Sequence, residues 1–591
     1  MAPMDRSDAV RRFFPLVLPA LLAFALAATG CGDDDGGSDP DADVPDGSTP
    51  AEPLEIDRLF TTDEGETCLY ASPIEVVSQG ERGVLTADLG GTLRAHDPIT
   101  GELQWSASLP EGPEGAGARE ILATPAALGN LLVVGWQHFR THHFIGVFDL
   151  ETRAMATDFP VLQLGGSVPN FDGTEDVDFR SDKQLMRGIV KLLPRPGAEL
   201  GLAYVALGNA PNSSPHHGWI FELDLDAWRA EGAEAAVLNR FSTTADNDCG
   251  PEGDPDPGLC GGGIWNAAGL QFYEDDEGQT QIYFATGNGR TNYNRRDYAN
   301  SLLRITPGLE FEDGCDPELC ADYDEVEPSR ACLASCRNVF TPRLMEGEPP
   351  LQLENGLCDG LAFTECYRLL DADLGSSGPV RITLPSGDAH FVQAGKDGAL
   401  YLVDGENMGV MHQRLQVMEF CGTEDDPCTA NWLGMFVTHP VVAEVDGDPV
   451  VILASNMADR THWSGISAVR ISETAEGPRM SVLWRVPEFD SEEGSSTFRH
   501  HPGRPVLYTV GGVDYVFVVE TRRGGVADPP GRLWGVRVDT GELVVRERLA
   551  DSGQRWSLPL VLEDRIYVAG CDPRAAEEGY LMGFQLSGGG L

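Results

Sequence analysis

The chain has 591 residues, 41% of them hydrophobic and 23% charged, which is enough apolar material to bury a large core. Its formal net charge of −51 repels nucleic acid and anionic lipid headgroups, so both are excluded as partners of the folded part. Beyond the N-terminus, no apolar run approaches the roughly 18 residues of a spanning helix, which also excludes a multi-span membrane protein.

Residues 1–30 have the three-part order of a secretory signal peptide, in which arginines precede the apolar run Phe13–Ala28 and small residues follow it. The sequence Ala28-Thr29-Gly30-Cys31 resembles the bacterial lipobox. This resemblance implies cleavage before Cys31 and acylation of its thiol. The alternative is an ordinary signal peptide that happens to contain a cysteine.

Residues 31–55 begin with this cysteine and continue as an acidic segment. From Gly32 to Glu55 there are nine acidic residues and no Lys or Arg, interleaved with Gly, Pro and Ser. Such a composition predicts a disordered, self-repelling spacer. With a lipid on Cys31, it predicts a protein of the cell envelope. The lipid would be its only membrane contact, in the outer membrane, and the body would face the periplasm or the cell surface.

One repeated unit fills residues 56–591. Its clearest copy, Gly91–Trp105, consists of two apolar/polar alternations joined by an Asp-x-x-Thr-Gly turn, which is typical of a β-hairpin. Related segments recur at Gly146–Arg153, Gly218–Trp228, Ser301–Phe311, Gly398–Gly409, Gly465–Trp484, Gly531–Leu543 and Tyr580–Leu586. A further strand pair precedes each copy. Four strands in each of eight units predict an all-β fold, an eight-bladed β-propeller of four-stranded antiparallel blades.

Two features modify this prediction. The count falls to seven blades if residues 54–60 complete the last, short unit. An insertion at about residues 312–370, which contains six cysteines, interrupts the spacing between units four and five. In a propeller, the loops that enter first strands and those that join second to third strands share one face, where functional loops are expected.

Export also accounts for the cysteines. Assigning Cys31 to the lipid leaves twelve of the thirteen, an even number suited to disulfides in an oxidising compartment. Short separations predict the pairs Cys249–Cys260, Cys358–Cys366 and Cys421–Cys428, and leave open the pairing of Cys315, Cys320, Cys332 and Cys336. Zinc binding is the alternative, although the paired C-x2-C spacing of zinc ribbons is missing.

Cys68 opens the first unit and Cys571 ends the second strand of the last. A propeller brings its first and last blades side by side to avoid exposed sheet edges. We therefore expect a Cys68–Cys571 disulfide that fastens the ring. Two buried free thiols are the alternative.

Several segments resemble the repeats of the quinoprotein alcohol dehydrogenase-like superfamily, whose catalytic members bind pyrroloquinoline quinone (PQQ). The resemblance covers most of residues 69–587 and implies a propeller. It rests on Ala71-Ser72-Pro73, Asp97–Gly101 and Gly395–Asp404, and most sharply on Ile264-Trp265, Tyr283–Asn288 and Asp373–Val380 leading into Lys396. These sharper parts are most similar to the polyvinyl-alcohol dehydrogenase branch.

The resemblance implies roles for three residues. Trp265 would stack under the quinone, Asn288 would ligate calcium, and Lys396 would contact the quinone oxygens. A catalytic aspartate is not identifiable from the sequence, although Asp373 is in a position to be tested for that role. These roles suit the residues, since a planar cofactor favours an aromatic floor and calcium favours oxygen ligands. However, Gln137–Phe144, where the family's calcium-binding glutamate would fall, contains no acid, and the chain has neither an adjacent Cys-Cys pair nor a haem segment.

Histidines form a second candidate constellation. His138, His142 and His143 lie in one second-to-third-strand loop and His216 and His217 in another, so all five map to the same face. Neutral imidazoles around a central channel could hold zinc, copper or iron. Alternatively, they are exposed or hydrogen-bond neighbouring turns.

These observations favour a membrane-tethered exported lipoprotein whose propeller is a non-catalytic binding or scaffold module for a protein or small-molecule ligand. The first alternative is a PQQ- and calcium-dependent alcohol or sugar dehydrogenase, from which the missing glutamate departs. The second is a scaffold for outer-membrane protein assembly, which the tether and the fold also suit.

Overall fold

The computed structural model describes residues 54–65, 67–210, 215–246, 249, 260–324, 328–349, 358–419, 436–456, 462–487, 498, 501–521, 530–571 and 578–588. Cys31, Cys421 and Cys428 lie outside the described residues, as do the leader and nearly all of the acidic spacer. Within the described part, no helix combines the length and the apolar character that crossing a membrane requires.

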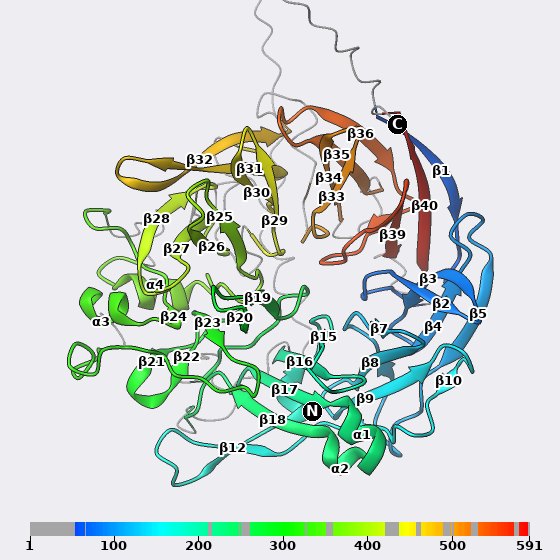
Figure 1. Ribbon diagram of the computed structural model, residues 1–591, viewed down its shortest axis with the longest axis horizontal. Coiled ribbons are helices and arrows are strands. Elements are labelled where there is room, and N and C mark those ends of the chain that lie inside the picture. Colours follow the sequence, from blue (N-terminus) through cyan, green and yellow to red (C-terminus); the bar gives the residue numbers. More distant parts are fainter. Residues whose placement is uncertain are drawn as a thin grey trace, which may run out of the picture. The chain divides into compact units, whose positions relative to one another are not determined.

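Alternating apolar and polar residues form antiparallel strands, which build eight sheets arranged around a ring (Figure 1). Blade one contains β2 (Ile74–Ser78), β3 (Glu81–Ala87), β4 (Thr92–His96) and β5 (Leu103–Ser108). Blade two contains β6 (Arg119–Glu120), β7 (Ala126–Leu128), β8 (Leu131–His138), β9 (His142–Asp149), β10 (Ala154–Met155) and β11 (Leu162–Gln163). In blade two, β6 and β7 share one edge and β10 and β11 share the other.

The next two blades carry additions. Blade three contains β14 (Gln184–Leu185), β15 (Lys191–Leu193), β16 (Leu202–Asn209), β17 (Trp219–Asp224) and β18 (Val237–Ser242). Blade four contains β19 (Gln271–Glu274), β20 (Thr280–Ala285), β23 (Leu302–Ile305) and β24 (Val339–Phe340). The remaining short elements here are the hairpins β12 (Ser167–Pro169)/β13 (Asp176–Asp178) and β21 (Thr291–Asn292)/β22 (Asp297–Tyr298), and the 3-10 turns η3 (Ser181–Lys183) and η4 (Tyr293–Arg295).

Blades five to seven are regular four-stranded sheets. Blade five contains β25 (Val380–Thr383), β26 (Ala389–Ala394), β27 (Ala399–Asp404) and β28 (Met411–Gln416). Blade six contains β29 (Val441–Val445), β30 (Asp448–Ala454), β31 (Ile466–Thr474) and β32 (Gly477–Val486). Blade seven contains β33 (Val506–Val510), β34 (Val513–Val519), β35 (Arg532–Arg537) and β36 (Leu543–Arg548).

The eighth blade joins the two ends of the propeller. It contains β37 (Ser552–Gly553), β38 (Leu560–Leu562), β39 (Arg565–Cys571), β40 (Gly579–Ser587) and, paired with β40, the N-terminal β1 (Glu55–Thr61). The N-terminal segment therefore completes the last unit, as the seven-bladed alternative required. The count is nevertheless eight, because the other seven sheets are complete without β1. A Cys68–Cys571 disulfide also joins the first and last units.

The insertion at residues 312–370 belongs partly to blade four, because it supplies the outer strand β24, which pairs with β23. It also contains the helices α3 (Arg330–Ser335) and α4 (Phe363–Leu369). The structure joins its cysteines as Cys315–Cys336, Cys320–Cys332 and Cys358–Cys366, and elsewhere joins Cys249 to Cys260.

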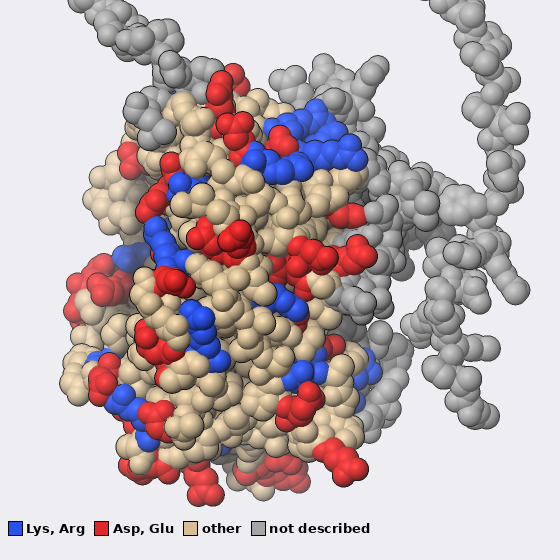
Figure 2. All heavy atoms as spheres, turned by 90° about the vertical axis from the view of Figure 1, so that its right-hand side faces the viewer, with Lys and Arg blue, Asp and Glu red and all other residues tan. Residues whose placement is uncertain are grey.

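The apolar core lies between neighbouring blades. Leu85 and Leu93 of blade one pack in one cluster with Val134 and Trp136 of blade two, and all four are fully or almost fully buried. Burying one such side chain is worth about 1.5–3 kcal/mol. On the outside, Figure 2 shows acidic side chains interspersed with basic ones over the side that it draws. This pattern differs from the basic stripe of a nucleic-acid-binding face.

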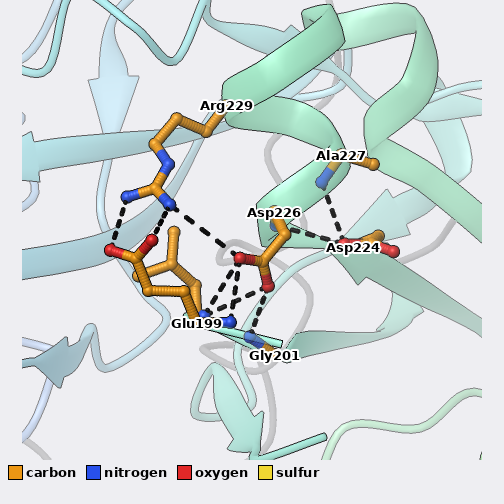
Figure 3. A network of polar contacts seen from close by, with 7 residues as sticks. Glu199, Gly201, Asp224, Asp226, Ala227 and Arg229 are labelled. Atoms are coloured by element: carbon orange, nitrogen blue, oxygen red, sulfur yellow. Dashed lines mark hydrogen bonds and ion pairs between the residues drawn. The ribbon is translucent and has the colours of Figure 1, made fainter. Parts of the chain in front are cut away.

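Helices α1 (Leu225–Glu231) and α2 (Ala233–Ala236) follow β17 in blade three, and a polar network fixes α1 (Figure 3). The carboxylate of Asp224 caps the helix by accepting the backbone N–H groups of Asp226 and Ala227 at 3.1 and 3.0 Å. Asp226 in turn accepts three backbone N–H groups of residues 199–201. The network therefore ties the helix to the loop that precedes β16.

Candidate functional site

Lys396 lies in the tight turn between β26 and β27, on the face predicted to carry function. Gly398 closes this turn with φ of 75°, a left-handed conformation that glycine adopts without strain. The Lys396 backbone N–H donates to the carbonyl of Asp373 at 3.1 Å. Its Nζ donates to Asp373 Oδ2 at 2.7 Å and to Asp371 Oδ2 at 3.2 Å. The ammonium group is thus held between two carboxylates, with its side chain only 3% exposed.

Burial sets the charge balance of this cluster. It raises the pKa of Asp373 to about 7, with Lys396 opposing the rise and Asp371 adding to it. Burial would lower the pKa of Lys396, but the two carboxylates outweigh it and raise that pKa. Among the described residues, the second carboxylate oxygen of Asp373, Oδ1, is buried without a hydrogen-bond partner. A buried acceptor without a partner is costly, which makes Asp373 a candidate ligand-contacting group.

Trp265 lies beside this pair. The Nζ of Lys396 is 4.5 Å from the centroid of the Trp265 ring. Two glycines make room for the indole: a Cβ on Gly208 would lie 2.5 Å from the Cβ of Trp265, and one on Gly287 would lie 2.7 Å from its Nε1. The structure therefore brings together three residues that the sequence proposed separately, namely Trp265, Asp373 and Lys396.

Four cations that the sequence analysis did not single out lie near this group, from the segments that enter blades three, seven and eight: Arg187, Lys191, Arg504 and Arg555. The Arg187 guanidinium lies 5.8 Å from the Trp265 ring and 4.0 Å from the Trp556 ring. The Arg555 guanidinium lies 4.5 Å from the centroid of the same Trp556 ring. None of the four has an ion-pair partner among the residues that the structure describes.

Arg504 is buried and the other three cations are half-buried, and Arg555 and Arg504 each lie close enough to a second cation to lower its pKa. Burial lowers the pKa of Arg187 to about 9, and the nearby charge of Arg555 contributes to the decrease. Burial likewise lowers the pKa of Lys191 to about 8, with Arg504 contributing. His439 has its pKa lowered to about 3 by burial and by Arg504 and Lys191. An anion would relieve this concentration of positive charge.

A cavity of about 410 Å³ adjoins the cations between the first strands of blades five to seven, which lie toward the centre of the ring (Figure 1). Its basic lining residues are Arg381 on β25, and His439 and Arg504 at the entrances to β29 and β33. Much of the remaining lining is apolar: Val380, Val441, Val442, Val506, Leu507 and Leu558. A hollow with apolar walls and convergent cations suits an organic anion.

Asn288, the proposed calcium ligand, is engaged with the insertion. Its Nδ2 donates to the backbone carbonyl of Arg368 at 3.0 Å, and its Oδ1 accepts the Nδ2 of Asn300 at 3.3 Å. Calcium needs six to eight oxygen ligands, so binding here would compete with this amide pair. The residues present thus fit the quinone part of a PQQ–calcium pair better than the calcium part.

The five proposed metal-binding histidines are distributed over two places. His138 hydrogen-bonds the carbonyl of Gly117 through Nδ1 at 2.9 Å, and His143 is buried edge-on against Phe179. His142 stacks on Phe144. Burial lowers the pKa of His143 to about 3.

His216 and His217 line a separate cavity of about 230 Å³ in blade three. The Nδ1 of His217 lies 2.7 Å from the hydroxyl of Thr244, and burial lowers the pKa of His216 to about 3 and that of His217 to about 4. Of the five histidines, only His217 belongs to a group of three possible ligands in the described part of the chain. Its companions are the disulfide-bonded Cys249 and Cys260.

No family profile and no curated protein matches the chain. Solved structures do resemble it. A quinohemoprotein alcohol dehydrogenase from Pseudomonas putida HK5 is 13% identical with a TM-score of 0.51, covering 91% of this chain and 76% of its own. A europium-containing methanol dehydrogenase is 11% identical with a TM-score of 0.51, covering 90% and 93%.

BamB from Moraxella catarrhalis is 11% identical with a TM-score of 0.41, covering 90% of this chain and 100% of its own. At these identities the likeness concerns the fold alone. The chain therefore shares the β-propeller fold of the quinoprotein alcohol and methanol dehydrogenases.

Proposed function

We propose that this chain is an exported lipoprotein, anchored to the outer membrane through Cys31, whose propeller binds a planar organic anion without turning it over. The observation that carries the binding proposal is Arg187, whose guanidinium lies 4.0 Å from Trp556 and 5.8 Å from Trp265. It has no acidic partner among the described residues. A planar anion could stack against the indoles while neutralising Arg187 and its neighbours.

The absence of turnover is proposed from the state of the two groups that chemistry would use. Asp373 Oδ2 accepts a hydrogen bond from the ammonium group of Lys396. This bond favours the ionised form of Asp373, but it also occupies the oxygen that would take a proton from a substrate. Asn288 gives both ends of its amide to protein partners. A ligand could therefore occupy the site without the calcium that a quinoprotein oxidation would need.

A PQQ- and calcium-dependent alcohol or sugar dehydrogenase is the second candidate, favoured by the convergence of Trp265, Asp373 and Lys396. In that case Trp265 would support the quinone and Lys396 would bind its oxygens. Bound PQQ would supply the two-electron acceptor. The Asp373 carboxylate could hold a proton, since its pKa is raised to about 7 by burial.

One titration separates the two candidates. PQQ, itself a planar anion, is added to the purified protein with and without Ca²⁺, while tryptophan fluorescence reports binding and an artificial dye reports alcohol oxidation. The binding proposal expects saturable quenching that does not require Ca²⁺ and no dye reduction. Dye reduction that depends on Ca²⁺ would support the dehydrogenase instead.

Variants locate the ligand. Arg187→Gln removes a charge-assisted contact and should weaken PQQ binding by about tenfold or more. Trp105→Phe, in the outer strand β5, is the matched control for Trp265→Phe and should leave the affinity unchanged. An affinity that is the same in Arg187→Gln and Trp265→Phe as in the wild type would remove this site from consideration.

The tether is tested separately. Intact-mass analysis of protein extracted from membranes should show an acyl adduct that Cys31→Ala abolishes. A soluble mature protein with an unmodified Cys31 would contradict the lipoprotein proposal and leave the ligand proposal standing.

A further inference from the structure

A compact group of potential metal ligands lies in blade five, away from the turn that carries Lys396. It comprises His390 on β26, Asp404 at the end of β27 and His412 on β28, and their ligand atoms all lie within 4.8 Å of one another. β27 runs from Ala399, beside the Lys396 turn, to Asp404. At about 3.4 Å per residue this separates the two sites by roughly 17 Å.

The geometry suits a tetrahedral ion. The Nε2 of His412 lies 3.4 Å from Asp404 Oδ2, and the two imidazole rings meet edge-on with centroids 4.9 Å apart. Ligands about 2.0–2.2 Å from a tetrahedral zinc ion are themselves about 3.3–3.6 Å apart. The pair of His412 and Asp404 therefore already has the separation that the ion would impose, and His390 needs only a small adjustment.

His390 supplies an independent observation. Its side chain is buried, with the residue 4% exposed, and its Nδ1 has no hydrogen-bond partner among the described residues. Buried ring nitrogens normally have partners. Ring nitrogens of His142, His143 and His216 share this property, so what sets His390 apart from them is its grouping with Asp404 and His412 within 4.8 Å.

The repeat itself shows that the fold does not require these histidines. His390 pairs with Asp404, and His412 is the extra residue of the β-bulge in β28. The equivalent positions of blade one are Gly83, Asp97 and the bulge residue Gln104. In blade three the same positions are Leu202, Asp224 and Leu238. Only the aspartate is common to the three blades, because it accepts backbone N–H groups of the following turn or helix. The two histidines of blade five therefore serve something other than folding.

We propose that His390, Asp404 and His412 bind a zinc ion. Two imidazoles and a carboxylate are ligands that zinc accepts, and three protein ligands leave a fourth position for water or a small ligand. Solvent can reach that position, because the side chains of His412 and Asp404 are 23% and 29% exposed. Neither the ring-centre ligand site nor the disulfides take part in this group.

Zinc titration of the whole chain under non-reducing conditions tests the proposal, in a Cys31→Ser background so that this thiol cannot compete. After treatment with EDTA, calorimetry with ZnCl2 should give one ion per chain, and Co²⁺ should give the visible bands of a four- or five-coordinate site. Zinc should also raise the melting temperature, since it binds only the folded chain.

Two variants preserve the fold and remove a ligand. His412→Gln introduces the residue type that blade one has at Gln104. Asp404→Asn keeps an oxygen for the N–H groups of Glu406 and Asn407, which Asp404 Oδ1 accepts at 3.0 and 2.8 Å. Each variant should weaken zinc binding by at least about 100-fold and lose the cobalt bands.

Asp97→Asn is the matched control, since Asp97 is the equivalent aspartate of blade one, and it should bind zinc as the wild type does. Absence of stoichiometric binding by the wild-type chain would overturn the proposal. So would wild-type affinity in both His412→Gln and Asp404→Asn, or a loss confined to Asp97→Asn.

Discussion

Blades one and five use the same backbone turn between their second and third strands for different purposes. In both, the turn is closed by a glycine with positive φ, Gly91 at 77° and Gly398 at 75°. The first turn residue donates its N–H to the segment that enters the blade, from Leu89 to Cys68 at 3.0 Å and from Lys396 to Asp373 at 3.1 Å. Cys68 and Asp373 thus occupy equivalent places.

The difference lies entirely in what these equivalent side chains contact. In blade one, Cys68 forms a covalent bond to Cys571 across the closure of the ring. In blade five, Asp373 forms a buried ion pair with Lys396 beside Trp265. The same scaffold position therefore stabilises the ring in one blade and builds a ligand site in the other.

Removing the bond in blade one should have the largest effect. In the chain-entropy model, a cross-link that closes 503 residues contributes roughly 6 kcal/mol to stability, and one that closes 8 residues roughly 2.5 kcal/mol. We therefore expect Cys68→Ser/Cys571→Ser to lower the free energy of unfolding in urea by more than Cys358→Ser/Cys366→Ser. Equal losses in the two double variants would contradict a special role for ring closure.

Breaking the ion pair in blade five should rank second. Lys396→Met leaves Asp373 buried without its cation, which typically costs about 3–5 kcal/mol. The double variant Asp373→Asn/Lys396→Met removes both charges and should regain most of the loss. Urea unfolding at pH 8 measures both, and a double variant no more stable than Lys396→Met would show that the pair matters through packing instead of charge.

The fold was predictable because its signals are local. Apolar/polar alternation recurs from unit to unit, and Asp97–Gly101 marks the turn of the clearest hairpin, so strand type follows from local pattern and blade number from counting the copies. The closure of the ring required one topological argument, and it placed Cys68 beside Cys571. The seven-bladed alternative could not be excluded from sequence, because the N-terminal strand does complete the last unit. Only the sheet pairings show that the other seven blades are complete without it.

The candidate site was predictable only in part. Trp265, Asp373 and Lys396 carry family-like motifs, and the structure brings them together. Arg187, Arg504 and Arg555 come from three separate loops that only the closed ring brings together, so no local pattern marks them. Their one signal is that basic residues are scarce in this chain, with 42 Lys and Arg against 93 acids.

Sorting the histidines by face gave an incomplete picture for a physical reason. Face assignment grouped the loop histidines but could not show which ring nitrogens find partners in turns, as His138 does. It also set aside His390 and His412, which lie on neighbouring strands of one blade. The metal roles of the five loop histidines and of Asn288 remain predictions.

The pH dependence of stability should distinguish the blade-five position from its covalent counterpart. Burial raises the pKa of Asp373 to about 7, above its unfolded value near 4. The folded state therefore holds a proton that the unfolded state has lost, and stability from this group falls as the pH rises from about 4 to about 7. Asp373→Asn should flatten this part of the stability profile, whereas Cys68→Ser/Cys571→Ser should shift the profile without changing its slope there.

The smallest effect should come from the turn aspartate on the opposite side of blade one. Asp97 Oδ1 accepts the N–H groups of Ile99 and Thr100 at 2.9 and 2.8 Å, and these bonds hold the pKa of Asp97 below its usual value. Asp97→Ala should cost about 1 kcal/mol, as loss of a similar side-chain cap does. Because the pKa is lowered in the folded state, this contribution is present above pH 4 and disappears as the pH falls through the folded value.

Asp97→Asn keeps the acceptor and should cost less than Asp97→Ala in urea unfolding at pH 7. If the two variants lost the same stability, the carboxylate charge would matter more than its hydrogen bonds, and the turn of blade one would not be a purely structural counterpart of the turn at Asp404.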